Sequence, residues 1–256
     1  MIARYEFERQ IETIIAGHMV KAYPYQWDED HITFGILRDF QENFRRIQIA
    51  DPRLQIEVEW EIYKLLIPEE TNFGDIGILL SAQLRDGTQL VGAGFIEAKI
   101  RDITKHRFLQ IRQKQNAHII RNAPNAQTLL YSPADVPVFD PAAYDAWPWF
   151  FIEPPLAAKI TRGPVVPISL VHATKKKDVS LYDLACSPSF QFVHRYFNCL
   201  DLEFSRDAID AVRGFPKKLG QPNYILKIRL APLDHELPRM PDVNTDAFAP
   251  IERARR

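Results

Sequence analysis

The chain has 256 residues, of which 46% are apolar and 25% charged, a balance that excludes a disordered or fibrous protein. Its formal net charge of −1 gives no overall case for a polyanion-binding protein, although residues 1–75 hold 15 acids and 8 bases and the remainder is therefore net basic. No apolar run approaches the roughly 20 residues of a membrane span, and the N-terminal residues do not resemble a signal peptide, so we expect a cytoplasmic protein with no membrane partner.

Two helices are expected at the N-terminal end. Apolar residues recur at helical spacing over residues 6–19 and again over residues 30–48. Asp28 or Asp30 is placed to cap the second helix, which puts Glu29 in its first turn. Two roles explain Glu29 equally well at this position. It is either a metal ligand or an acid that the helix dipole stabilises.

The periodicity then changes to that of strands. Residues 55–66, 75–84 and 89–100 predict three strands in an antiparallel meander, with an Asp-Gly pair in the turn between the last two. Residues 104–122 return to helical spacing and residues 127–131 are short and strand-like, which predicts a right-handed parallel crossover. The expected fold is a mixed α/β (α+β) protein with a central mixed β-sheet flanked by helices, in the order α-β-β-β-α-β.

The C-terminal half predicts an α/β extension. After a proline-rich connector over residues 133–167, the expected elements are a strand at 165–171, helices near 190–200 and 205–213, and a strand at 224–230. The expected division is a core over residues 1–135, an extension packed on it over residues 136–231 and a loose tail over residues 232–256.

An acid and an acid-x-lysine motif lie on the second and third strands of the predicted meander. Glu97 and Lys99 share one face of the third strand, and Asp75 begins the second. A two-residue turn would set residue 75 opposite residue 98, whereas a three-residue turn of Arg85–Gly87 sets it opposite Glu97; a glycine bulge is the alternative. Opposed residues lie about 5 Å apart at Cβ, so Asp75 and Glu97 can share a hard cation.

This pattern, with Asp75 in FGDIGILL and the acid-x-lysine in GFIEAKI, resembles the PD-(D/E)xK nuclease superfamily, the restriction-endonuclease-like fold. The resemblance covers roughly residues 28–132, and Gly74 stands where the family label has proline. It implies Mg²⁺- or Mn²⁺-dependent hydrolysis of phosphodiester bonds, with Lys99 orienting the attacking water and neutralising the phosphorus.

The resemblance also implies two further site residues. An acid on the first core helix is matched by Glu29, which would join Asp75 and Glu97 as a metal ligand. A polar residue on the helix after the lysine is matched by Gln115, with Gln113 and Gln110 as weaker alternatives. We expect four basic side chains of the same segment to contact the phosphates of the nucleic-acid backbone: Lys105, Arg107, Arg112 and Lys114. Ordinary solvent-exposed charge on a helix explains the presence of these side chains equally well.

The function expected from the sequence is a metal-dependent endonuclease acting on double-stranded DNA, as the effector of a bacterial restriction or antiviral defence system. A helicase or ATPase partner is expected, because the sequence has no Walker-type phosphate loop. The alternatives are a non-catalytic nucleic-acid-binding or assembly module with the same fold, and an RNase with the same site.

Overall fold

The computed structural model describes residues 1–50, 55–66, 73–139, 158–215 and 220–251. Its helices are α1 (Arg4–Ala22), α2 (Glu29–Phe44), α3 (Gln113–Asn122), α5 (Ile168–Thr174), α6 (Pro188–Phe190) and α7 (Arg206–Arg213). Its strands are β1 (Arg46–Ala50), β2 (Gln55–Leu65), β3 (Ile76–Gln83), β4 (Gln89–Ile100), β5 (Gln127–Tyr131), β6 (Val136–Phe139), β7 (Ala158–Thr161), β8 (Val165–Pro167), β9 (Tyr224–Pro232) and β10 (Phe248–Pro250).

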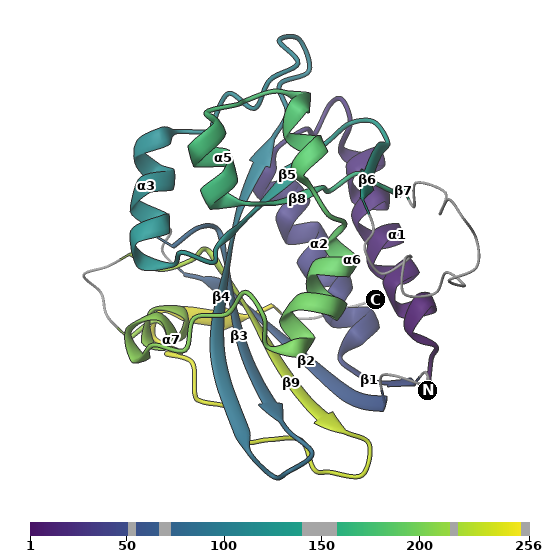
Figure 1. The fold of residues 1–256 in the computed structure, drawn as a ribbon, viewed down its shortest axis with the longest axis vertical. Helices are drawn as coiled ribbons and strands as arrows, with labels where there is room; N and C mark the ends of the chain where they lie inside the picture. Colours follow the sequence, from purple (N-terminus) through teal and green to yellow (C-terminus); the bar gives the residue numbers. More distant parts are fainter. Residues whose placement is uncertain (51–54, 67–72, 140–157, 216–219, 252–256) are drawn as a thin grey trace, which may run out of the picture.

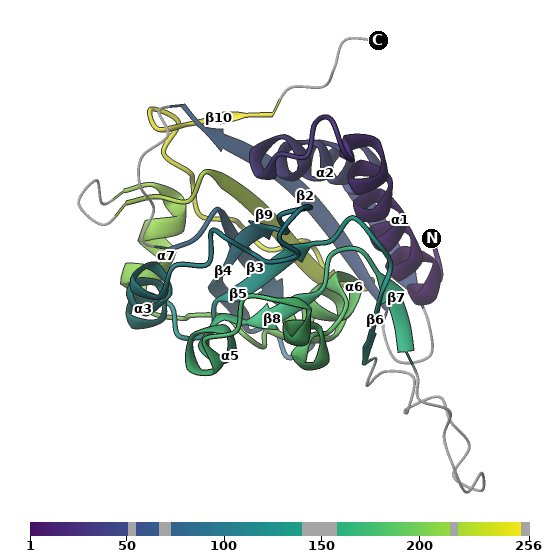
Figure 2. The same cartoon turned by 90° about the horizontal axis from the view of Figure 1, so that it is seen from above.

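A mixed sheet of eight strands forms the centre of the molecule, so the expected mixed α/β class with helices flanking a mixed sheet is confirmed. Strands are hydrogen-bonded in the order β1-β2-β9-β3-β4-β5-β8, and β10 pairs with β2; β6 and β7 form a separate hairpin. Figures 1 and 2 show α1, α2 and α6 on one face of the sheet and α3, α5 and α7 on the other. No helix of the described part of the chain has an apolar stretch long enough to cross a bilayer.

The N-terminal helices agree with the sequence pattern except at one end. The side chain of Asp28 caps α2 by accepting a hydrogen bond from the backbone N–H of His31 at 2.9 Å. The helix ends at Phe44 and not at residue 48, because Arg46–Ala50 pair antiparallel with β2 as strand β1. Pairing with a distant strand therefore overrides helical spacing in those last residues.

The predicted three-strand meander is wrong, because β2 and β3 are not neighbours. Strand β9, from residues 224–232, lies between them, antiparallel to β2 and parallel to β3. The expected core over residues 1–135 therefore lacks a central strand, which the chain supplies from near its C-terminal end. The expected loose tail is also wrong for residues 233–251, since Phe248 is fully buried and β10 pairs with β2; residues 252–256 lie outside the described residues.

The β3–β4 hairpin has the odd turn that the sequence analysis requires. Leu84 donates its N–H to the Thr88 carbonyl at 2.8 Å, which leaves the three residues Arg85–Gly87 as the turn. Gly87 has a φ of +87°, which favours glycine at this position. The register is regular from the turn to the pair Ile76 and Ile96, so no bulge intervenes.

The crossover after β4 is confirmed, since β4 and β5 are parallel and joined through α3. The helix is shorter than expected, beginning at Gln113 and not at residue 104. Phe108 and Ile111, whose spacing suggested a longer helix, instead lie in a loop and are buried in a third apolar cluster with Leu181 and Val171. Apolar spacing alone does not separate a helix from a loop that buries its side chains in a core.

The C-terminal elements differ in detail from the prediction. The strand expected at 165–171 ends at Pro167, and α5 begins at the next residue. The helix expected near 190–200 is an irregular run in which α6 continues into tighter and wider turns up to Asn198. Ser205 caps α7 as expected, its hydroxyl accepting from the N–H of Ala208 at 3.2 Å. Of the predicted connector, residues 140–157 lie outside the described part.

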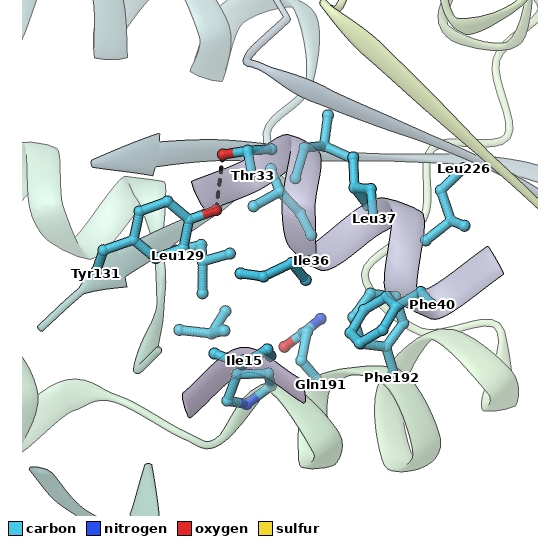
Figure 3. A pocket seen from close by; sticks show the side chains of 14 residues that line it. Ile15, Thr33, Ile36, Leu37, Phe40, Leu129, Tyr131, Gln191, Phe192 and Leu226 are labelled. Atoms are coloured by element: carbon cyan, nitrogen blue, oxygen red, sulfur yellow. Dashed lines mark hydrogen bonds between the residues drawn. The ribbon is translucent and has the colours of Figure 1, made fainter. Parts of the chain in front are cut away.

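Apolar side chains bury both faces of the sheet. Trp60, Phe40 and Phe7 belong to the cluster under α1 and α2, and Phe95 and Val212 to the cluster under α3 and α7. A cavity of about 20 Å³, room for roughly one water molecule, remains beside α2 and is lined by the side chains shown in Figure 3. At one end of it, Thr33 and Tyr131 hydrogen-bond to each other at 2.8 Å.

The position of β9 gives a test of the topology. Leu226 is fully buried in the centre of this strand, so Leu226→Ala should lower the free energy of unfolding by about 2–5 kcal/mol, the usual cost of such a truncation in a core. Urea unfolding of the full chain measures this. Glu236→Ala, at an exposed position beyond the strand, is the control and should change stability by less than about 0.5 kcal/mol. Equal stabilities of the two variants would contradict a central β9.

Candidate active site at the end of β4

Five side chains from four elements meet where β4 ends. Asp75 immediately precedes β3, and Glu97 and Lys99 lie among the last four residues of β4. Glu29 is the first residue of α2 and Gln115 lies in the first turn of α3. Each of them is joined to at least one of the others by a hydrogen bond or an ion pair. The structure therefore brings together the residues that the sequence analysis named as the catalytic and metal-binding set.

Asp75 is held rigidly against both neighbouring strands. One carboxylate oxygen, Oδ2, accepts from the backbone N–H of Ala98 at 2.8 Å, and Oδ1 accepts from the side-chain amide of Asn223 at 3.3 Å. Gly74 before it has a φ of +97°, and a Cβ there would lie 2.9 Å from the Ile96 carbonyl oxygen. Proline, whose φ is fixed near −65°, cannot adopt this conformation, so position 74 excludes proline.

Lys99 lies at the centre of the carboxylates. Its Nζ is 2.5 Å from Glu97 Oε1, 3.5 Å from Glu29 Oε1 and 3.9 Å from Asp75 Oδ2. It also donates to the Ala98 carbonyl at 2.6 Å, and the residue is only 4% exposed. All three acids therefore lie on the same side of β4 as the ammonium, as the predicted register requires.

Glu97 and Glu29 differ in how their second oxygens are satisfied. Gln115 donates its side-chain amide to Glu97 Oε1 at 2.7 Å, the same oxygen that contacts Lys99. Glu97 Oε2 is buried and accepts no hydrogen bond from the described residues. Glu29 Oε2, in contrast, accepts from the backbone N–H of Ile100 at 3.2 Å. A buried carboxylate oxygen without a partner is costly, so Glu97 Oε2 is where an additional cation or donor would be stabilised most.

Burial dominates the electrostatics of the cluster. It raises the pKa of Glu97 to about 8, with repulsion from Asp75 adding to the effect, and it raises the pKa of Glu29 to about 7 against the attraction of Lys99. The pKa of Asp75 is raised for the same reason. Burial by itself would lower the pKa of Lys99, but the attraction of Glu97, Asp75 and Glu29 outweighs it and raises that pKa.

The donor set suits a hard divalent cation: the carboxyl groups of Asp75 and Glu97 lie within hydrogen-bonding reach of each other, and both lie beside the Lys99 ammonium. No group of three or more His, Cys, Asp or Glu side chains in the described residues is arranged to hold a metal ion. The oxygens of Asp75, Glu97 and Glu29 are nevertheless the ligands that Mg²⁺ and Mn²⁺ prefer, and Glu97 Oε2 has an unused lone pair. By ligand type these three residues fit such a cation, although the structure has the Lys99 ammonium, and not a metal geometry, among their oxygens.

The four basic residues predicted to contact phosphates are all exposed. Among the described residues, none of them forms a hydrogen bond or an ion pair with the carboxylate cluster. Lys105 and Arg107 lie in the loop between β4 and α3, Arg112 is the residue before α3, and Lys114 is in its first turn. Of the alternatives to Gln115, Gln110 is exposed in the same loop, and the Gln113 side-chain atoms are buried without a hydrogen-bond partner among the described residues. Gln115 alone among these three amides bonds to a site carboxylate.

Sequence reasoning missed the residues that support the site from β9 and β5. Asn223 bonds to Asp75, and the next residue, Tyr224, donates its hydroxyl to Asp30 at 2.6 Å. Thr33 donates to the Glu29 carbonyl at 2.7 Å and bonds to Tyr131 at the end of β5. The available signal was an Asn-Tyr pair directly before a strand, but it becomes informative only when that strand is known to lie beside β3.

Comparisons of this chain with protein-family models, with curated proteins and with solved structures found no match.

The raised pKa values predict how metal-free stability depends on pH. Between the ordinary glutamate value of 4.5 and about 8, the folded cluster binds more protons than the unfolded chain, so the free energy of unfolding should fall as pH rises through this window. Glu97→Gln removes the group with the higher pKa and should make the fall shallower.

Urea unfolding in a chelating buffer from pH 5 to pH 8.5 measures this dependence. Glu236→Gln, which neutralises an exposed acid, is the matched control and should keep the wild-type slope. If Glu97→Gln left the slope unchanged, Glu97 would not be a buried ionisable group in solution.

Proposed function

We propose that this chain is a metal-dependent nuclease with a restriction-endonuclease-like core that hydrolyses phosphodiester bonds in DNA. The observation that carries the proposal is the register of β3 and β4, which continues from Ile76 and Ile96 to set Asp75 opposite Glu97, with Lys99 beside them. Glu29 and Gln115 close the cluster from helices on opposite faces of the sheet. Three acids, one lysine and an orienting amide at a single strand end are the groups that phosphodiester hydrolysis needs.

Asp75, Glu97 and Glu29 would hold the cation. A bound Mg²⁺ or Mn²⁺ supplies Lewis acidity at the phosphoryl oxygen and lowers the pKa of a water. Lys99 would orient the attacking water and neutralise negative charge that develops on the phosphate, because its ammonium lies beside Glu97 and Asp75. Gln115 positions Glu97, and the N–H of Ala98 positions Asp75, so both carboxylates are fixed before substrate binds.

The proposed substrate is double-stranded DNA, and the proposed setting is the effector of a bacterial restriction or antiviral defence system. The exposed bases at Lys105, Arg107, Arg112 and Lys114 support contact with backbone phosphates. The sequence has no Walker-type loop, which supports a separate helicase or ATPase as the source of any nucleotide-driven step.

One observation favours the non-catalytic alternative, a nucleic-acid-binding or assembly module. The Lys99 ammonium already forms ion pairs with all three carboxylates, in the place where a cation would otherwise bind. Titration calorimetry with Mn²⁺ separates the two functions. Binding that Asp75→Asn abolishes supports the nuclease, and the absence of binding in the wild-type chain favours the module.

Cleavage assays test the proposal directly. Purified protein should cut plasmid DNA with Mg²⁺ or Mn²⁺ and lose activity with a chelator. Lys99→Ala and Asp75→Asn should each reduce the rate about 100-fold or more, since each removes a charge acting on the reacting phosphate. Gln115→Ala, which removes a positioning group, should cost about tenfold.

Arg85→Ala is the control, because Arg85 is an exposed base at the turn of the β3–β4 hairpin, far along the strands from the site. It should cut at the wild-type rate. Equal cutting by Lys99→Ala would defeat the proposal, and cutting of RNA in place of DNA would establish the RNase alternative.

A further inference from the structure

A cleft of about 350 Å³ lies beside the carboxylate cluster. It is formed where the connection between α1 and α2 meets the segment that follows β4, at the top of Figure 1. Its walls include an aromatic ring, three aliphatic side chains and four polar side chains, one of them an acid: Trp27, Ile100, Ile103, Leu109, Arg101, Gln110, Thr104 and Asp102. The cleft thus offers both an apolar surface and hydrogen-bonding groups next to the site.

The cleft and the site share a wall. The indole N–H of Trp27 donates to the Arg101 carbonyl at 2.8 Å, and the N–H of Ile100 donates to Glu29 at 3.2 Å. The start of α2 is therefore joined to the end of β4 by one bond on the cleft side and one on the site side. Arg101 follows Lys99 by two residues, which is about 7 Å along an extended chain.

One aromatic side chain, Trp27, lines this cleft. Tyr23 packs edge-to-face against it with ring centroids 5.7 Å apart, which helps to fix the indole in place. Leu109, an exposed apolar side chain, lines the cleft from the loop after β4. A planar ring and an amide such as Gln110 in one cleft suit a nucleobase, which stacks on aromatic faces and hydrogen-bonds through its edges.

A basic cluster flanks the cleft on the same loop. The N–H of Phe108 donates to the Lys177 carbonyl at 2.7 Å, which brings the loop containing Lys105 and Arg107 against the segment after α5. Five bases gather there, and all but the last are exposed: Lys105, Arg107, Lys175, Lys176 and Lys177.

Two acids face this cluster. Asp102 accepts from the backbone N–H of Lys105 at 2.7 Å, and Asp178 accepts from the N–H of Ser180 at 3.0 Å. Asp178 lies within electrostatic reach of Arg107 and Lys176, which confirms that the two basic segments are neighbours. Five bases against two acids leave the cluster net positive, the charge that complements a phosphate backbone.

We propose that the cleft binds an unpaired nucleobase of the substrate strand, next to the phosphate that is cut, and that the basic cluster binds the backbone of the same strand. This inference rests on the proposed function in taking a nucleic acid as the ligand of the site. It narrows the substrate from any duplex to one with an unpaired nucleotide beside the cut, such as a duplex opened by a helicase.

Fluorescence anisotropy in a chelating buffer tests the inference, because binding is then measured without cleavage. The wild-type chain should bind a labelled single-stranded oligonucleotide more tightly than a duplex of the same length. Trp27→Leu should weaken single-strand binding about tenfold or more, the scale of one lost base stack. Trp27→Phe, which keeps a planar ring, should restore most of the affinity.

Two matched controls locate the effect. Tyr5→Ala removes an exposed aromatic at the start of α1, at the opposite end of the molecule, and should bind as the wild type does. The double variant Lys175→Gln and Lys176→Gln should weaken binding and flatten its dependence on salt concentration, whereas Arg85→Gln should change neither.

The outcomes distinguish the inference from the proposed function. Equal single-strand affinity of Trp27→Leu and the wild type would overturn the inference, as would duplex binding at least as tight as single-strand binding. Either result leaves the cleavage assays with Lys99→Ala and Asp75→Asn to decide the nuclease proposal separately. Trp27-dependent binding without any cleavage would support the cleft and count against the catalytic function.

Discussion

The pairing of β3 with β4 decides on which side of the sheet Asp75 lies. Side chains alternate along a strand, so a shift of one residue would move Asp75 away from Glu97 and Lys99. The turn of Arg85–Gly87 has three residues, and the register that it sets runs without a bulge as far as Ile76 and Ile96. A turn at one end of the hairpin thus determines the chemistry at the other end.

Given this register, the charge state of the cluster depends on two opposing effects, the cost of burying charged groups and the attraction between Lys99 and the carboxylates. Burying Glu97, Glu29 and Asp75 favours their protonated forms, and burying Lys99 favours its neutral form. The short contact between Lys99 and Glu97 offsets part of that cost, and removing one partner of a buried pair typically costs about 3–5 kcal/mol. A cluster that is stable only when its charges are matched is also one that responds to an added cation.

The site depends on both ends of the chain. Asn223 and Tyr224 lie at the start of β9. Asn223 hydrogen-bonds to Asp75, directly before β3, and Tyr224 hydrogen-bonds to Asp30 in α2. Because β9 lies between β2 and β3, the two parts cannot be separated without removing a central strand. The C-terminal residues therefore support the carboxylate cluster through Asn223 and Tyr224.

The sequence by itself determined the elements whose periodicity is local. It predicted the bounds of β4 and β5, a cap at Asp28 or Asp30, the parallel crossover and an odd turn or a bulge, and it placed Glu29 and Gln115 on the correct helices. These predictions depend on alternation, capping and turn length, and each of those features is set by neighbours within a few residues.

Only the tertiary structure decided what depends on distant partners. Residues 46–50 form a strand because they pair with β2. Residues 104–112 form a loop and not a helix, because Phe108 and Ile111 are buried in a separate apolar cluster. The insertion of β9 and the cleft at Trp27 follow from contacts between segments that lie far apart along the chain. No local pattern encodes such pairings, because their free energy comes from surfaces that exist only after the chain has folded.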